Sequence, residues 1–132
     1  MRIRAAAPLA LVLVAAACGA SEPSVYKPTG TADCLRGDDY RVTTDVSKVG
    51  VVAASASLGA LRAFEPGNTL TISFGSGPVE AAAIVRGYRR FAPKRLKRHL
   101  DDVLRTEKNA VLLWTITPSA EKLDAVLGCL KG

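Results

Sequence analysis

Histidine is almost absent from this chain of 132 residues, which contains only His99. A general base needs an orienting partner and a nearby nucleophile, and the residues around His99 do not supply both. Neither the cysteines nor this histidine have the spacing of a zinc site. Asp38 and Asp39 follow a glycine and favour a turn, because a calcium cage needs six or more oxygen ligands. We therefore expect no metal, no cofactor and no catalytic residue, and a protein that is not an enzyme.

Long apolar runs and aromatic residues are also scarce. After residue 18, no apolar run approaches the length that a helix needs to span a bilayer. Phe, Trp and Tyr together make up 5% of the chain. Tyr88 and Phe91 are expected on the apolar side of their helix, so no aromatic residue is expected among the cations on its exposed side, as base stacking would require. The sequence thus predicts neither a second membrane segment nor a nucleic-acid partner.

The N-terminus has the order of a secretory signal. Met1-Arg2-Ile3-Arg4 is cationic, 5–17 is apolar and uncharged, and three alanines precede Cys18. The junction Val14-Ala15-Ala16-Ala17-Cys18 resembles the lipobox of bacterial lipoproteins. The resemblance implies that residues 1–17 are removed and that Cys18 carries a diacylglycerol and a further acyl chain such as palmitate. It also implies an anchor in the cell membrane, with the protein on the extracytoplasmic face.

Residues 18–31 are rich in Pro, Gly, Ser and Thr and favour a flexible tether from the lipid to a folded part. Residues 32–132 then suffice for a single domain. If Cys18 carries the lipid, Cys34 and Cys129 remain as a pair in an oxidising compartment, where we expect a disulfide. The alternative is two buried free thiols.

Two strands form the clearest predicted pair. Residues 60–64 and 69–74 flank Glu65-Pro66-Gly67-Asn68, whose Pro and Gly fit a type II turn. In the second strand, Leu70, Ile72 and Phe74 alternate with Thr and Ser. We therefore expect a hairpin in an antiparallel sheet whose polar face meets water.

The remaining elements complete an α+β pattern. We expect strands at 40–44 and 110–117, helices at 46–58 and 79–92, a turn-rich helical piece reaching 107, and a last helix after Pro118. The order β-α-β-β-α-β is that of a ferredoxin-like two-layer sandwich, here with an added C-terminal helix. In that topology the last strand lies beside the first, which brings Cys34 and Cys129 to the same end of the sheet.

Positive charge is concentrated in residues 86–98, which we call the basic segment. Its seven cations are Arg86, Arg89, Arg90, Lys94, Arg95, Lys97 and Arg98. Without them, the 16 basic residues after Cys18 fall to nine, against 12 acidic residues. The segment could bind anionic lipid, an anionic wall polymer or an acidic protein. The alternative is a solvated helix face, with Asp101 and Asp102 neutralising its lower part.

Three function classes follow from these patterns. We favour a lipid-anchored binding module that uses the basic segment. The second is a small envelope hydrolase with Ser76 and His99 in one cleft, and the third is a structural or assembly lipoprotein that uses an exposed sheet face. The Gly75-Ser76-Gly77-Pro78 loop could hold an anion at a helix N-terminus, but it lacks the Lys-Ser/Thr of a phosphate loop and favours a plain turn.

Overall fold

The computed structural model describes residues 23–132 and contains one five-stranded antiparallel sheet. The strand order is β1-β2-β3-β5-β4. The strands are β1 Arg41–Thr43, β2 Ala60–Glu65, β3 Asn68–Phe74, β4 Leu104–Glu107 and β5 Ala110–Trp114. With its six α-helices, including the predicted C-terminal one, the domain has the expected α+β class.

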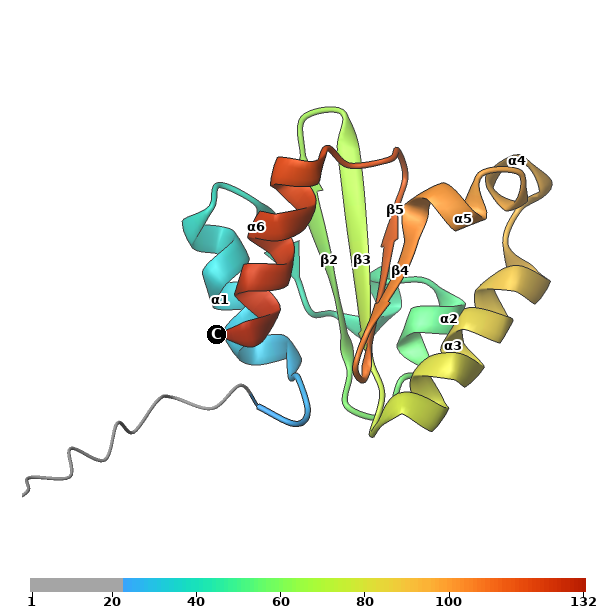
Figure 1. Ribbon diagram of the computed structural model, residues 1–132, viewed down its shortest axis with the longest axis horizontal. Coiled ribbons are helices and arrows are strands. Elements are labelled where there is room, and N and C mark those ends of the chain that lie inside the picture. Colours follow the sequence, from blue (N-terminus) through green and yellow to red (C-terminus); the bar gives the residue numbers. More distant parts are fainter. Residues whose placement is uncertain (1–22) are drawn as a thin grey trace, which may run out of the picture.

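The helices lie on both sides of the sheet (Figure 1). They are α1 Pro28–Gly37, α2 Val51–Ala54, α3 Pro78–Phe91, α4 Lys94–Lys97, α5 Leu100–Val103 and α6 Ala120–Lys131, and a 3-10 turn, η1, covers Val46–Lys48. α1 and α6 pack together on one side, and α2 and α3 pack together on the other. No helix within residues 23–132 is long and apolar enough to cross a membrane. The predicted signal peptide, 1–17, and Cys18 lie outside the described residues.

The two faces of the sheet differ in composition. One face carries large apolar side chains, among them Leu61, Leu70, Ile72, Leu112 and Trp114, and we call it the leucine face. The other is the threonine face, which carries Arg62, Thr69, Thr71, Ser73, Leu113 and Thr115. α1 and α6 bury the leucine face in the main core. α3 covers only part of the threonine face, where Tyr88 Oη lies 3.4 Å from Ser73 Oγ.

The predicted hairpin is confirmed. Phe64 pairs with Thr69 and Glu65 with Asn68, and Gly67 has a φ of +82°. A positive φ is the conformation that glycine adopts at little cost, as the third position of a type II turn requires. The expectation that the whole polar face meets water was wrong, because Thr71 and Ser73 are buried. Thr69, nearer the turn, is half-buried.

The strand order differs from the predicted ferredoxin-like arrangement. β1 is an edge strand that pairs only with β2, and β5 pairs with β3 and β4. Gly50, with a φ of +90°, divides the predicted helix 46–58 into η1 and the one-turn α2. These short pieces cannot serve as a full crossover helix, so β2 folds back beside β1. β4 was not predicted, because it lies within the piece expected to be helical.

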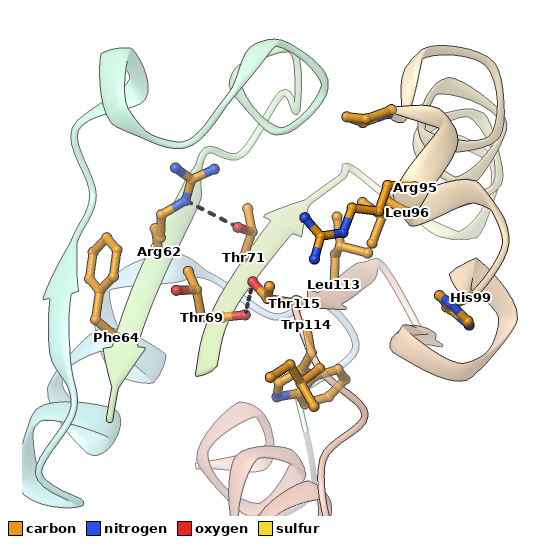
Figure 2. Close-up of a pocket in the computed structure, with 12 residues that line it drawn as sticks. Arg62, Phe64, Thr69, Thr71, Arg95, Leu96, His99, Leu113, Trp114 and Thr115 are labelled. Atoms are coloured by element: carbon orange, nitrogen blue, oxygen red, sulfur yellow. Dashed lines mark hydrogen bonds between the residues drawn. The ribbon is translucent and has the colours of Figure 1, made fainter. Parts of the chain in front are cut away.

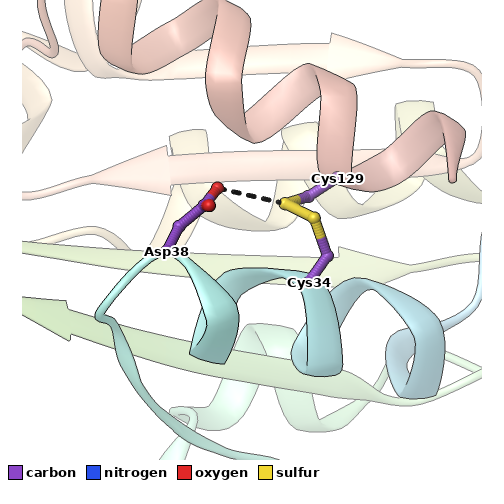
Figure 3. Close-up of side chains that lie close together, drawn as sticks. All are labelled: Cys34, Asp38 and Cys129. Carbon is purple, nitrogen blue, oxygen red and sulfur yellow. Dashed lines mark hydrogen bonds between the residues drawn. A yellow bond between two sulfur atoms is a disulfide. The ribbon is translucent and has the colours of Figure 1, made fainter.

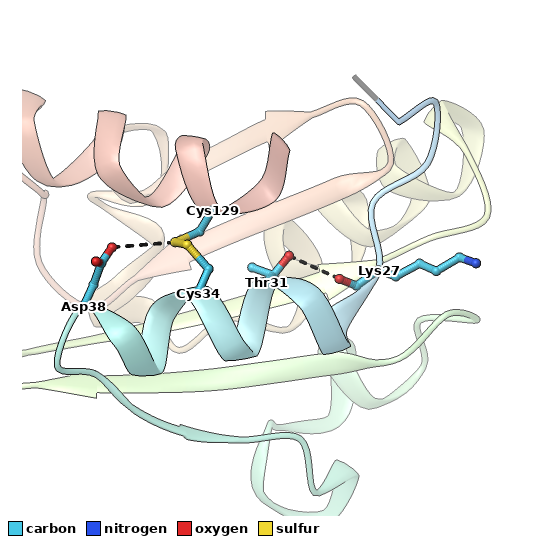
Figure 4. Close-up of a disulfide and its surroundings, with 5 residues drawn as sticks. All are labelled: Lys27, Thr31, Cys34, Asp38 and Cys129. Atoms are coloured by element: carbon cyan, nitrogen blue, oxygen red, sulfur yellow. Dashed lines mark hydrogen bonds between the residues drawn. A yellow bond between two sulfur atoms is a disulfide. The ribbon is translucent and has the colours of Figure 1, made fainter. Parts of the chain in front are cut away.

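The domain begins earlier than the expected boundary at residue 32. Tyr26 is buried, and α1 starts at Pro28, so this part of the expected tether is folded. The Thr31 hydroxyl donates to the carbonyl of Lys27 in the first turn (Figure 4). Asn109 holds the entering chain with its side chain, accepting from Tyr26 N at 2.7 Å and donating to Tyr26 O at 2.9 Å.

Cys34 and Cys129 form the predicted disulfide, with 5.4 Å between their Cα atoms (Figure 3). The expected reason for their proximity was wrong, since β2 and β3 separate β1 from β5. The two cysteines meet because α1 and α6 lie side by side on the leucine face. The disulfide thus links the two helices that cover this face.

Candidate functional site: a basic segment beside a groove

All seven cations of the basic segment are exposed, as predicted. They occupy the last turns of α3, α4, and the residue that follows α4. Ala81, Ile84 and Tyr88 are buried on the opposite side of α3, which directs the arginines outward. Phe91 was expected on this buried side, but it is 68% exposed. The helix ends at Phe91, because Pro93 favours an extended conformation at Ala92. Phe91 therefore lies at the end of the helix, where its ring stays exposed.

The acidic residues that follow neutralise little of this charge. Within residues 23–132, Arg89 alone among the seven forms an ion pair, with 3.0 Å between its Nη2 and Asp101 Oδ1. Both side chains are more than half exposed, and such pairs contribute about 0–1 kcal/mol. Arg105 donates to the backbone carbonyl of Asp101 instead of its carboxylate. The predicted neutralisation by neighbours on the same helix is therefore absent at this position.

An open groove of about 820 Å³ lies between the threonine face and α4 (Figure 2). Thr69, Thr71 and Leu113 form part of its floor, and Arg95 and Leu96 stand over them from α4. The groove exists because α3 ends at Phe91 and does not cover the part of the threonine face that lies near the β2–β3 turn. Its volume is in the range of small-molecule sites, about 300–1,000 Å³.

Arg62 is fixed at the centre of this surface. Its Nε donates to Thr71 Oγ1 at 3.3 Å, and its Nη2 donates to the carbonyl of Val49 at 3.0 Å. Two of its five N–H donors are thus engaged by the protein. Because a guanidinium stays charged in proteins, the floor of the groove carries a permanent, oriented cation.

A second recess of about 420 Å³ continues the groove toward α2. It shares Arg62, Thr71, Pro93, Leu96 and Leu113 with the first part, so the two are continuous. The new lining is mainly apolar, with Val49, Val51, Val52, Ala53, Tyr88, Phe91 and Ala92. Burial raises the pKa of the Tyr88 phenol, so this hydroxyl is neutral and adds no negative charge here.

The structure separates Ser76 from His99. Ser76 precedes α3, whereas His99 lies between α4 and α5, beyond the other end of α3 (Figure 1). Since a helix rises about 1.5 Å per residue, the 14 residues of α3 span about 21 Å. The two residues therefore do not share a cleft. The alternative hydrolase, which required Ser76 and His99 side by side, is not supported by this arrangement. His99 lines the groove instead.

The loop before α3 is occupied by the protein's own carboxylate. Glu80 Oε2 accepts from Ser76 N at 3.3 Å and from Ser57 N at 3.1 Å, and the Ser57 hydroxyl also donates to this carboxylate. The side-chain hydrogen bond from Ser57 lowers the pKa of Glu80. The loop is thus a capped turn, as its sequence favoured.

Asp38 lies close to the disulfide, with 3.6 Å between its Oδ2 and Cys129 Sγ (Figure 3). Cys34 and Cys129 could coordinate a cation only as thiolates, and here their sulfurs are bonded to each other. Asp39 has a φ of +68°, which fits the expected turn. This cluster carries no binding function in the disulfide state.

The sequence patterns predicted one side of the groove but not its floor. Arg95 was predicted as a binding residue, and it lines the groove. Arg62 was not predicted, although it is the only cation in the strand sequence Ala60–Glu65. Its alternation with the buried Leu61 and Ala63 was the available signal, because it places Arg62 on the face opposite to theirs, together with Thr71. No protein family, curated protein or solved structure matches this chain.

Proposed function

We propose that the chain is a lipid-anchored binding module at the extracytoplasmic face of the cell membrane, with no catalytic role. Its basic segment contacts an anionic partner. The observation that carries this proposal is the exposure of seven neighbouring cations, of which only Arg89 has a carboxylate partner within residues 23–132. Such a surface attracts anions and speeds their association.

The side of the domain that carries the basic segment favours a partner away from the anchoring bilayer. A chain coming from Cys18 joins the domain at α1, which packs on the leucine-face side with α6. α3 and α4 lie on the other side of the sheet (Figure 1). A wall polymer or an acidic protein can reach these cations without the domain turning over. Binding to anionic lipid is therefore measured alongside binding to these two partners.

The test is binding of the mature chain, residues 18–132 with Cys18→Ser so that no detergent is needed. The probes are poly(glycerol phosphate), poly-glutamate and phosphatidylglycerol vesicles. We expect salt-sensitive binding to one of the two polymers, and a loss of tenfold or more when Arg86, Lys94 and Arg98 are changed to Glu.

The matched control changes Lys27, Lys48 and Lys131 to Glu, which alters the net charge equally at exposed sites outside the basic segment. We expect this control to keep most of the binding. Equal losses in both triple variants would show that only net charge matters, and no binding to any probe would refute the proposal.

The lipid anchor has a separate test. Mass spectrometry of the mature protein from host membranes should show an N-terminal acylated Cys18 and loss of residues 1–17. Recovery of an untrimmed, unmodified chain would contradict the anchor.

A further inference from the structure

The groove has a polarity gradient along its length. The part near the β2–β3 turn is lined by the polar residues Arg62, Arg95, His99 and three threonines together with apolar residues such as Phe64, Leu113 and Ile116. The part toward α2 is lined almost entirely by aliphatic and aromatic side chains. Arg62 and Leu96 belong to both parts, so the cationic and the apolar regions are joined.

The charge of the groove is unbalanced. Neither part of its lining contains an Asp or a Glu, whereas it contains two arginines. Arg62 rises from β2, and Arg95 extends toward the sheet from α4 (Figure 2). Two guanidinium groups without a carboxylate between them favour an anion, and the planar fork of arginine matches a carboxylate in particular.

The apolar part is incompletely covered. At its rim, Val51 is 89% exposed and Phe91 is 68% exposed. Arg90 places its guanidinium 5.2 Å from the centre of the Phe91 ring, and Arg90 itself does not line the recess. A recess of about 420 Å³ with such a rim suits one narrow apolar chain.

We propose that this groove binds a single-chain amphiphile, a long-chain carboxylate. Its headgroup lies between Arg62 and Arg95, and its alkyl chain follows Leu96 and Leu113 toward Val49 and Val52. Charge complementarity selects the headgroup, and the apolar recess next to it accommodates one chain. The inference goes beyond the proposed function and does not require it, because the groove shares only Arg95 with the basic segment.

The first test measures binding of saturated carboxylates by calorimetry below their micellar concentrations, with the Cys18→Ser mature chain. Dodecanoate should bind with one molecule per chain, and affinity should rise about two- to fourfold per methylene from octanoate to dodecanoate, as burial of alkyl groups requires. Dodecanol should bind at least tenfold more weakly. Equal affinity for dodecanol, or a stoichiometry well above one, would overturn the proposal.

Two neighbouring residues provide the variant test. Arg95→Gln removes a cation that lines the groove, whereas Lys94→Gln removes an exposed cation next to it that does not. We expect the first change to weaken dodecanoate binding about tenfold and the second to leave it within twofold. Arg62→Gln should act like Arg95→Gln, but Arg95 decides the test, since its side chain is exposed and its loss does not endanger folding.

The two proposals fail separately. The triple Glu variant at Arg86, Lys94 and Arg98 should lose polymer binding and retain dodecanoate, and Arg62→Gln should do the reverse. Equal dodecanoate affinity in Arg95→Gln, Lys94→Gln and the unchanged protein would refute the groove site and leave the basic segment unaffected.

Discussion

The two faces of the sheet differ in how completely the helices cover them. On the leucine face, α1, α6 and the Cys34–Cys129 disulfide cover a continuous apolar layer. On the threonine face, α3 stops at Phe91, and parts of β2, β3 and β5 remain open beside seven exposed cations. The comparison indicates that helices and a disulfide close the first face, whereas the second is only partly covered and can carry charge and a groove.

The sharpest way to break this comparison is to open the disulfide. Changing Cys34 and Cys129 to Ala removes a link across 95 residues, and the chain-entropy model predicts a loss of about 4–5 kcal/mol in the free energy of unfolding. Urea unfolding of the double variant and of the reduced, unchanged protein should agree. A loss below about 1 kcal/mol in both would show that the α1–α6 layer does not depend on this link.

Two adjacent leucines in β5 compare the faces directly. Leu112 is fully buried on the leucine face, whereas Leu113 is half-buried in the floor of the groove. Leu112→Ala should lower the free energy of unfolding by about 3 kcal/mol, because it leaves a cavity in a packed layer. Leu113→Ala should lower it by about 1 kcal/mol, because little of the side chain is packed. Equal losses would mean that the groove is closed in solution.

The smallest predicted effect is pH-dependent and lies at the end of the threonine face away from the groove. Because hydrogen bonds from Ser57 lower the pKa of Glu80 in the folded state, they contribute stability above the unfolded-state pKa of about 4.5. This contribution is lost as the pH falls through the lower folded-state value. The carboxylate is accessible to solvent, so we expect an effect below about 1 kcal/mol.

Thermal unfolding between pH 6 and pH 3 measures this term. Ser57→Ala should reduce the loss of stability over that range, and Ser55→Ala, whose hydroxyl donates to the backbone of Val52, is the control that should not. A steeper loss in Ser57→Ala would contradict the assigned direction.

Local patterns predicted most of the elements but not their arrangement. The Pro66-Gly67 turn, α3 and the buried face of α6 follow from short-range chemistry, so they were found. The strand order depends on how far residues 44–59 can reach, and this was decided by Gly50, whose positive φ interrupts the expected helix. Sequence periodicity alone does not reveal that interruption.

The missed pieces owe their structure to distant partners. α1 starts in a sequence rich in turn formers, and the entry to it is held by Asn109, 83 residues away from Tyr26. β4 exists because Leu104 and Arg105 pair with β5. For the site, the cluster of cations was visible in the sequence, whereas the position of Arg62 in the groove required the register of β2 against β3.

The most direct test of the difference between the faces is an amide NMR titration of the mature Cys18→Ser chain with dodecanoate. The account predicts chemical-shift changes in Val49–Val52, Thr71, Leu96 and Leu113, with α1 and α6 unchanged. Changes centred on α1 and α6, or none at a saturating dodecanoate concentration, would contradict the assignment of binding to the threonine face.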